Sequence, residues 1–132
     1  MSFLGELLDA CLAVGASALP GATVQRGLTP ISGLAPVPRV LMGYAIEAPA
    51  AELAHLQERR SPRLGLWLVE AGRTQEEAYA DADALRTALY ADRSLGGLAD
   101  SLFVENVEPF EHVADGRVSI LLTVAVRRVV AA

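Results

Sequence analysis

The chain has 132 residues, 52% of them apolar, and carries a net charge of −5 at pH 7. This length predicts a single domain, residues 1–132, with enough chain for a buried core. The acidic balance argues against a surface that holds nucleic acid, although DNA could pass close by without being bound. No apolar stretch is long enough to span a bilayer, so we expect no membrane segment.

The first predicted element is a helix over Ser2–Ala18, with Ser2 as its N-cap and Pro20-Gly21 beyond its end. Its apolar side chains recur at helical spacing: Leu4, Leu7, Leu8, Cys11 and Leu12. Ala16-Ser17-Ala18 imitates a signal-peptidase site, but two carboxylates interrupt the apolar run and no basic residue precedes it. We therefore expect no secretory signal and a protein made in the cytosol.

A short strand candidate, Ala22–Arg26, comes next. The stretch from Gly27 to Pro38 then holds three prolines and two glycines, a density that neither a helix nor a central strand tolerates. We expect residues 28–38 to form an extended loop or arm. Connections of this length are uncommon in compact domains unless they have a function.

Two further strands are predicted at Arg39–Glu47 and Arg63–Ala71, because apolar residues alternate along both. The second has apolar residues on both faces, which predicts a position inside the sheet. The segment between them, Pro49–Arg60, is ambiguous. It could form a helical turn or two, or a variable loop that carries charges.

Thr74–Ala91 is the best predicted helix, because Thr74 and Glu77 have the spacing of a capping box. Gly96-Gly97 follow a helix end, whereas phosphate-binding glycines precede a helix, so we expect them to stop the helix. A strand over Leu98–Glu111, interrupted near Pro109, should follow. The Asp115-Gly116 pair predicts a hairpin turn into a last strand, Arg117–Val130.

These elements predict an α+β fold: a small mixed, largely antiparallel sheet of four to five strands with two main helices on one face. No residue pattern indicates catalysis, a metal or a cofactor. Cys11 is the lone cysteine and is predicted to be a buried hydrophobe, with a reactive thiol as the alternative. His55 and His112 are predicted to be ordinary surface or boundary residues, and no spacing favours a triad with Ser101.

Charged groups gather in two places. An acidic run comprises Glu105, Glu108, Glu111 and Asp115, and is predicted to be a solvated strand edge that discourages unwanted pairing. The alternative is an acidic surface past which DNA moves. The small basic groups Arg59-Arg60 and Arg127-Arg128 are too sparse for a nucleic-acid site, and a salt-bridging role across a subunit contact is the alternative to an ordinary surface.

The order of these elements resembles the tail terminator (tail completion) family of long-tailed phages and phage-tail-like particles. The resemblance rests on the first helix, the proline-rich stretch that ends in Val37-Pro38-Arg39-Val40, and the strand around Leu66-Trp67-Leu68-Val69 before the second helix. Its most specific part is the exit Asp92-Arg93-Ser94-Leu95-Gly96-Gly97 with the closing hairpin. It covers most of the chain in order of elements.

The resemblance implies a structural virion protein of the tail, assembled in the host cytoplasm, that performs no catalysis. Its copies would form a ring, commonly hexameric, that caps the tail tube, stops its polymerisation and meets a neck or head-completion protein. DNA would pass through without specific binding. The residues we expect at a subunit or tube interface are Leu28, Pro30, Pro36, Arg59, Arg60, Arg93, Leu95 and Arg127, and the expected acidic lumen face is the acidic run.

Two alternatives stay open. A head-completion, neck or minor tail protein shares parts of the same pattern. A cytosolic enzyme or ligand-binding domain on a ferredoxin-like sheet is the alternative from another class, and it predicts a concave pocket with convergent polar groups.

Overall fold

The computed structural model describes residues 3–28, 39–47, 50–54, 57–112 and 116–131. Two helices and seven strands lie in this part of the chain. They are α1 (Phe3–Ala18), β1 (Thr23–Arg26), β2 (Arg39–Glu47), β3 (Ala50–Ala54), β4 (Gln57–Arg60), β5 (Arg63–Ala71), α2 (Gln75–Ala91), β6 (Ser101–His112) and β7 (Arg117–Ala131). Three predicted features lie outside the described residues: the N-cap Ser2, residues 29–38 of the extended loop expected over 28–38, and Asp115 of the expected hairpin turn.

The fold is α+β, as predicted, and its sheet is mixed. The strand order is β1-β2-β5-β7-β4-β3, with β6 on the other side of β7. β1 runs parallel to β2, and every other pair is antiparallel. β5 lies between β2 and β7, which confirms its predicted place inside the sheet.

The prediction of four to five strands was too low because it left residues 49–60 unassigned. This segment forms the hairpin of β3 and β4, and β4 pairs with the end of β7. Its alanine-rich sequence has no alternating pattern, so local propensity gives little indication of a strand. The conformation of this segment is decided by pairing with a strand about 70 residues further along the chain. The predicted alternative of a helical turn does not form among the described residues of the segment.

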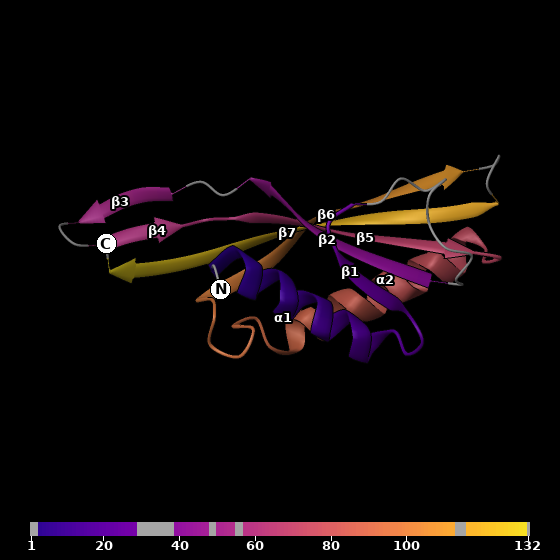
Figure 1. The fold of residues 1–132 in the computed structure, drawn as a ribbon, viewed down its shortest axis with the longest axis horizontal. Coiled ribbons are helices and arrows are strands. Elements are labelled where there is room, and N and C mark those ends of the chain that lie inside the picture. The colour runs from indigo at the N-terminus through magenta and orange to yellow at the C-terminus, as the bar shows by residue number, and fades with distance from the viewer. Residues whose placement is uncertain (1–2, 29–38, 48–49, 55–56, 113–115, 132) are drawn as a thin grey trace.

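The 15-residue strand β7 connects two parts of the molecule. Its first half pairs with β5 and its last residues, Arg128–Ala131, pair with β4, so that β4 and β5 follow one another along the same side. Ser61 and Pro62 interrupt the strand between β4 and β5. The Val126 amide donates to the Pro62 carbonyl there at 2.9 Å. We call β3, β4 and Arg128–Ala131 the arm. Figure 1 shows it extending beyond the helices, at the left of the view.

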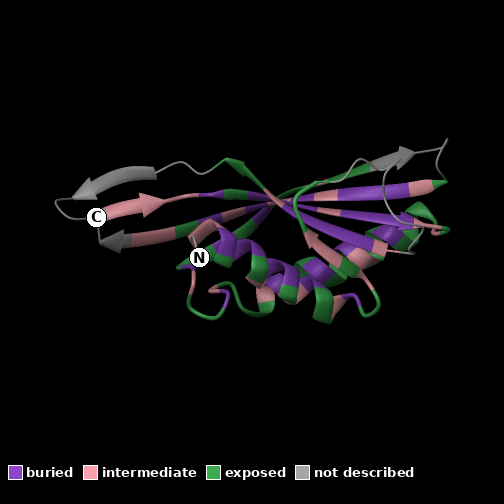
Figure 2. Cartoon of the chain, in the orientation of Figure 1, coloured by how far each residue is buried: buried purple, intermediate pink, exposed green. Residues whose placement is uncertain are grey.

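Both helices lie on one face of the sheet, as predicted (Figure 1). Leucine and valine side chains of β5 and β7 meet the apolar stripes of α1 and α2 in one core. Figure 2 shows these inner surfaces buried, while the outer surfaces of the helices are exposed. Side chains of this core with at most 1% of their surface exposed are Leu7, Cys11, Leu19, Leu41, Leu64, Leu66, Leu68, Ala78, Leu85, Leu89, Ile120, Leu122 and Val124.

Helix α2 begins as the sequence predicts. The Glu77 amide donates to the Thr74 hydroxyl at 3.2 Å and the Thr74 amide donates to the Glu77 carboxylate at 3.1 Å, which completes the capping box. These hydrogen bonds from Thr74 lower the pKa of Glu77. The cap therefore fixes the point at which the chain leaves β5 and turns back under the sheet.

Helix α2 ends at Ala91, as predicted, with Asp92 as its C-cap, and the glycines lie in the turn beyond it. The Asp92 carboxylate accepts from the Ser94 hydroxyl at 2.6 Å and from the Gly96 amide at 2.8 Å, and these bonds lower its pKa. Leu95, Gly96 and Gly97 all have positive φ, so the glycines serve the turn that follows the helix.

Strand β6 is continuous through Pro109, where an interruption was predicted. Pro109 stands opposite Ile120 in the ladder. Because β6 pairs with β7 alone among the described strands, the proline nitrogen can face away from the ladder without loss of a hydrogen bond. The irregularity lies instead between Val104 and Asn106, where the register shifts as in a β-bulge.

Candidate assembly surfaces

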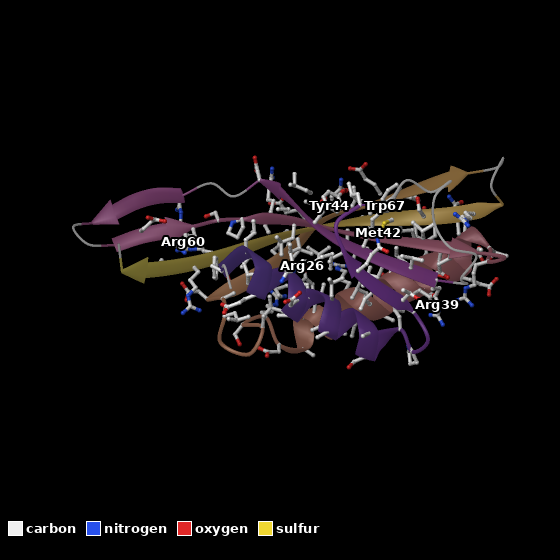
Figure 3. All side chains as sticks on the ribbon, in the orientation of Figure 1. Arg26, Arg39, Met42, Tyr44, Arg60 and Trp67 are labelled. Carbon is white, nitrogen blue, oxygen red and sulfur yellow. The ribbon has the colours of Figure 1, made fainter. Side chains whose placement is uncertain are left out.

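The second face of the sheet is also apolar, and no helix of the described residues covers it. We call it the helix-free face. By register it carries Val40, Met42 and Tyr44 of β2, Trp67 and Val69 of β5, Leu121, Thr123 and Ala125 of β7, and Phe103 and Glu108 of β6. Val40, Met42 and Val69 form a small buried cluster, separate from the main core, with Trp67 packed against it. Figure 3 labels Met42, Tyr44 and Trp67 on this side.

Tyr44 lies across the middle of the helix-free face. Gly65 stands opposite it on β5, and a Cβ placed on Gly65 would come within 2.4 Å of the ring carbon Tyr44 Cζ. The missing side chain therefore makes room for the aromatic ring above the strand. Burial and then the negative charge of Glu108 raise the pKa of Tyr44. The ring thus covers part of the sheet and its hydroxyl stays neutral.

An ion-pair row crosses the middle of the molecule, where the arm begins. The Arg63 guanidinium contacts Glu47 Oε1 at 2.9 Å and Glu105 Oε2 at 2.7 Å. Both carboxylates raise the pKa of Arg63. Because Arg63 is itself largely exposed, this row ties β2, β5 and β6 together without contributing much to stability.

The arm and the adjoining end of β7 are basic. Arg60 pairs with Glu58 at 3.0 Å and lies 5.7 Å from the centroid of the Phe3 ring, so it joins the arm to α1. Arg128 donates to the Gly97 carbonyl at 2.6 Å. Arg127 is exposed and makes no ion pair with any described residue, and the Nε of Arg59 is buried without an acceptor.

The predicted acidic run does not act as one group. Glu105 is held by Arg63, whereas Glu108 is exposed, accepts from the Asn106 side-chain amide and has no cationic partner among the described residues. The side chains of Glu111 and Asp115 lie outside the described part. Glu108 is thus the carboxylate of this run that is free to meet an external charge.

The other predicted interface residues are scattered. Leu28, next to β1, is 52% exposed, and Arg93 lies 4.1 Å from the Tyr90 ring centroid. Leu95 is only 6% exposed and packs in the main core, so it offers little surface to a partner. Pro30 and Pro36 lie outside the described residues. The structure therefore brings Arg59, Arg60 and Arg127 together on and beside the arm and leaves the rest apart.

A buried carboxyl stands at the polar end of the helix-covered face. Glu70 has no exposed surface, and Arg73 Nε donates to its Oε2 at 2.8 Å, while Oε1 has no partner. Arg73 also reaches Asp81 of α2 at 2.7 Å, and Arg39 of β2 lies 3.6 Å from the same carboxylate. Burial and the nearby Asp81 raise the pKa of Glu70 to about 7 despite Arg73. This network connects α2 to the sheet.

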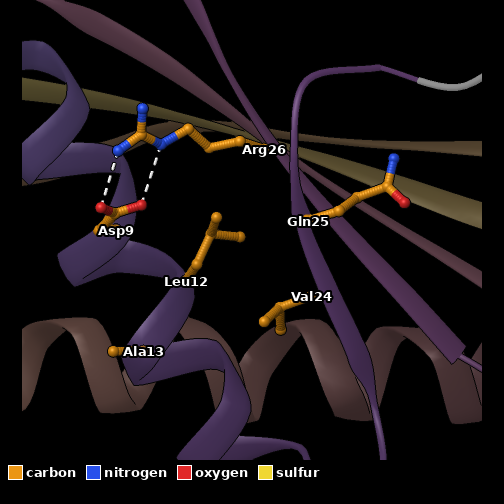
Figure 4. A pocket seen from close by; sticks show the side chains of 6 residues that line it. All are labelled: Asp9, Leu12, Ala13, Val24, Gln25 and Arg26. Atoms are coloured by element: carbon orange, nitrogen blue, oxygen red, sulfur yellow. Dashed lines mark hydrogen bonds and ion pairs between the residues drawn. The ribbon is translucent and has the colours of Figure 1, made fainter.

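An open groove separates α1 from the edge strand β1. Leu12, Ala13, Val24 and Gln25 line it, and the ion pair of Asp9 with Arg26 closes one end (Figure 4). The two Asp9–Arg26 contacts measure 2.7 and 2.9 Å and lower the pKa of Asp9. Since the charges are already paired, the groove presents no convergent free polar groups of the kind that an enzyme pocket uses.

The residues considered for chemistry are dispersed. Burial raises the pKa of Cys11 to about 12, which removes the thiolate that a reactive cysteine needs. No group of three or more potential metal ligands occurs in the part of the chain that the structure describes. Ser101 begins β6, and the side chains of His55 and His112 lie outside the described part. In that same part, no helix is both long and apolar enough to cross a bilayer.

Sequence reasoning missed the helix-free face as a candidate site. The residues concerned are Tyr44, Trp67, Leu121 and Phe103, and each was treated only as part of a predicted strand. A usable indication was present: with both helices assigned to one face, an apolar second face has nothing left in the predicted elements to cover it.

Comparison with known proteins gives little further information. No protein-family model matches the chain, and no curated protein matches it. Among solved structures, the chain is similar to one described as "Virion of native gene transfer agent (GTA) particle", with 11% identity and a TM-score of 0.37. That alignment covers 87% of this chain and 84% of the other. A likeness at this TM-score carries no argument, so the function is argued from the residues of this chain.

Proposed function

We propose that the chain is a structural, non-enzymatic subunit of a phage or phage-like tail, a tail terminator. Its copies close into a ring, with six as the expected number, at the head-proximal end of the tail tube. The ring stops tube growth and gives the neck or head-completion protein a surface to join. The residue pattern that resembles this family is the first support for the proposal.

The observation that carries the proposal is that the monomer leaves strand edges and part of an apolar sheet face uncovered. Among the described residues, the sheet has a second apolar face that no helix covers, on which Phe103 is 55% exposed and Tyr44, Trp67 and Leu121 are partly exposed. The described strands also include an arm of three strands beyond the core and open edges on β1 and β6. Exposed strand edges and large apolar faces are costly in a free monomer, and proteins retain them where another chain covers them. A subunit that works by assembly accounts for all three features.

The charge supports the DNA-related part of the proposal. A net charge of −5 repels phosphate, so a channel formed by such subunits would let DNA pass without holding it. The exposed carboxylate of Glu108 contributes to this balance.

The experiment is to measure the mass of the purified chain by native mass spectrometry, alone and with the tail-tube protein encoded near it, and to image the product by negative-stain electron microscopy. We expect a closed ring with a central hole, and tubes that stop growing when the chain is added. A chain that stays monomeric and leaves tube length unchanged would contradict the proposal. Binding to a portal or neck protein with no effect on tubes would instead favour the head-completion alternative.

A further inference from the structure

The helix-free face carries exposed charges of opposite sign toward its two ends, and Arg117 of β7 lies on the same face at the Glu108 end. Arg127 and Arg59 lie toward the arm, and Glu108 lies near the other end of β6. Glu108 is on β6 opposite Leu121, and Arg127 is six residues further along β7. At about 3.4 Å per residue, some 20 Å separate the two groups, which is about twice the screening length in physiological salt. The two ends therefore cannot neutralise one another within one subunit.

Each end lacks a counter-charge of its own. Among the described residues Arg127 makes no ion pair, and Glu108 has only the Asn106 amide beside it. Arg63 lies between them but is already occupied by Glu47 and Glu105. The unmatched charges are thus opposite in sign, and they flank an apolar surface.

The apolar surface between the charges is partly open. Phe103 is 55% exposed, and the half-buried side chains of Tyr44, Trp67 and Leu121 continue the patch across the strands. A surface with an apolar centre and charged groups at its margin has the anatomy of a protein interface. Because Arg127 and Glu108 are exposed on either side of this patch and have opposite charges, a second copy can place its Arg127 beside Glu108.

We propose that the arm-side arginines of one copy, Arg127 and Arg59, dock against the Glu108 end of the helix-free face of a second copy, with Phe103 in the contact. The inference deepens the proposed function and rests on its premise that copies of the chain associate. It gives Glu108 a role in subunit contact, distinct from the lumen role that the sequence predicts. Charge pairs of this kind fix the register of a contact and exclude wrong partners.

A charge swap tests the contact. Self-association of the full chain is measured by light scattering and native mass spectrometry for Arg127→Glu, for Glu108→Arg and for the double variant. Each single change places like charges together, so we expect the dissociation constant to rise at least about tenfold. The double variant restores opposite charges and should return to within about threefold of the original chain.

Matched controls come from the outer surface of α2. Asp83→Arg and Arg86→Glu make the same charge changes at exposed positions away from the helix-free face. They should leave association unchanged. Thermal unfolding of every variant should match the original chain, since the altered side chains are exposed.

The outcomes separate this contact from the proposed function. A ring that the single variants leave intact would overturn the contact and keep the ring. Two-fold dimers that obey the charge swap would support the contact and contradict ring closure. A chain that never self-associates, with or without the tube protein, would overturn both.

Discussion

The two faces of the sheet are made by the same strands but differ in how far their apolar side chains are buried. On β7, Leu122 is fully buried under the helices, whereas its neighbour Leu121 is only half-buried on the other face. On β5, Leu66 and Trp67 differ in the same way. The difference shows that an apolar residue in a central strand indicates that something packs against it, but the residue alone does not identify what packs there. On one face the partner is a helix of the same chain. On the other, Val40, Met42 and Val69 are already buried within the subunit, and for the open part around Phe103 we infer a second copy.

The sharpest way to separate the faces is to shorten the two neighbouring leucines. Leu122→Ala should lower the free energy of unfolding by about 2–5 kcal/mol, because it leaves a cavity in a closed core. Leu121→Ala removes half-exposed surface and should cost about 1 kcal/mol. Urea denaturation measures both. Equal losses would mean that the helix-free face of the monomer is packed as tightly as the core.

Two glycines give a second matched pair. A Cβ on Gly15 of α1 would lie 2.2 Å from Leu41 Cδ2, whereas a Cβ on Gly65 would meet the Tyr44 ring at 2.4 Å. Leu41 is enclosed by the core, so Gly15→Ala should cost about 1–3 kcal/mol despite the better helix propensity of alanine. Tyr44 can rotate toward solvent, so Gly65→Ala should cost less than about 1 kcal/mol. Thermal unfolding of both variants checks the order, and a reversed order would place the tighter packing on the helix-free face.

The helix-covered face should also respond to pH through Glu70. Its pKa rises from 4.5 to about 7 on folding, so the folded state binds the extra proton between these values. The stability that this proton provides is complete below about pH 4.5 and is lost as the pH rises through about 7. The charged groups around it are Arg39 of β2, Arg73 in the turn before α2, and Asp81 of α2.

Glu70→Gln should therefore flatten the pH dependence of unfolding by on the order of 1–3 kcal/mol between pH 4.5 and 7.5. Chemical denaturation across this range measures the effect. Glu76→Gln, at an exposed position in the first turn of α2, is the control and should leave the curve unchanged. A Glu70→Gln curve that still falls with pH would mean that another group carries the dependence.

The smallest effect on stability is expected at Phe103. Phe103→Ser should change the free energy of unfolding by no more than about 0.5 kcal/mol, because over half of this side chain is already exposed. It should nevertheless weaken self-association, which sedimentation velocity measures. The adjacent Leu102 is 2% exposed and faces the core, so Leu102→Ser should instead unfold the subunit. Unchanged association of Phe103→Ser would remove this residue from the inferred contact.

The sequence predicted most of the fold because its helices and long strands have local patterns. The capping box at Thr74 and the alternation in Arg63–Ala71 are examples, and both are confirmed. The hairpin of β3 and β4 could not be predicted in this way, because its pairing with β7 is remote in sequence. The hydrogen bonds of the Asp92 carboxylate, which organise the turn after the helix, were not predicted, because side-chain contacts at helix ends depend on geometry.

The candidate site was harder to predict than the fold. The basic residues Arg59 and Arg127 were identified by type, and the structure adds that they adjoin an apolar face. Their lack of partners, and the engagement of Glu105 by Arg63, depend on distances between strands that no sequence pattern contains.

The central place of β7 has a consequence for the order of events during synthesis. β7 is translated after β4, β5 and β6, yet it is the strand with which all three pair. Until residues 117–131 leave the ribosome, the edge of β5 that pairs with β7 stays unpaired. The hydrophobic core also lacks the apolar side chains that β7 contributes. Partly made chains of this kind expose strand edges that aggregate, and pairings remote in sequence form slowly. We therefore expect nascent chains halted before β7 to depend on chaperones, and release of the last strand to be the step that commits the subunit to its fold.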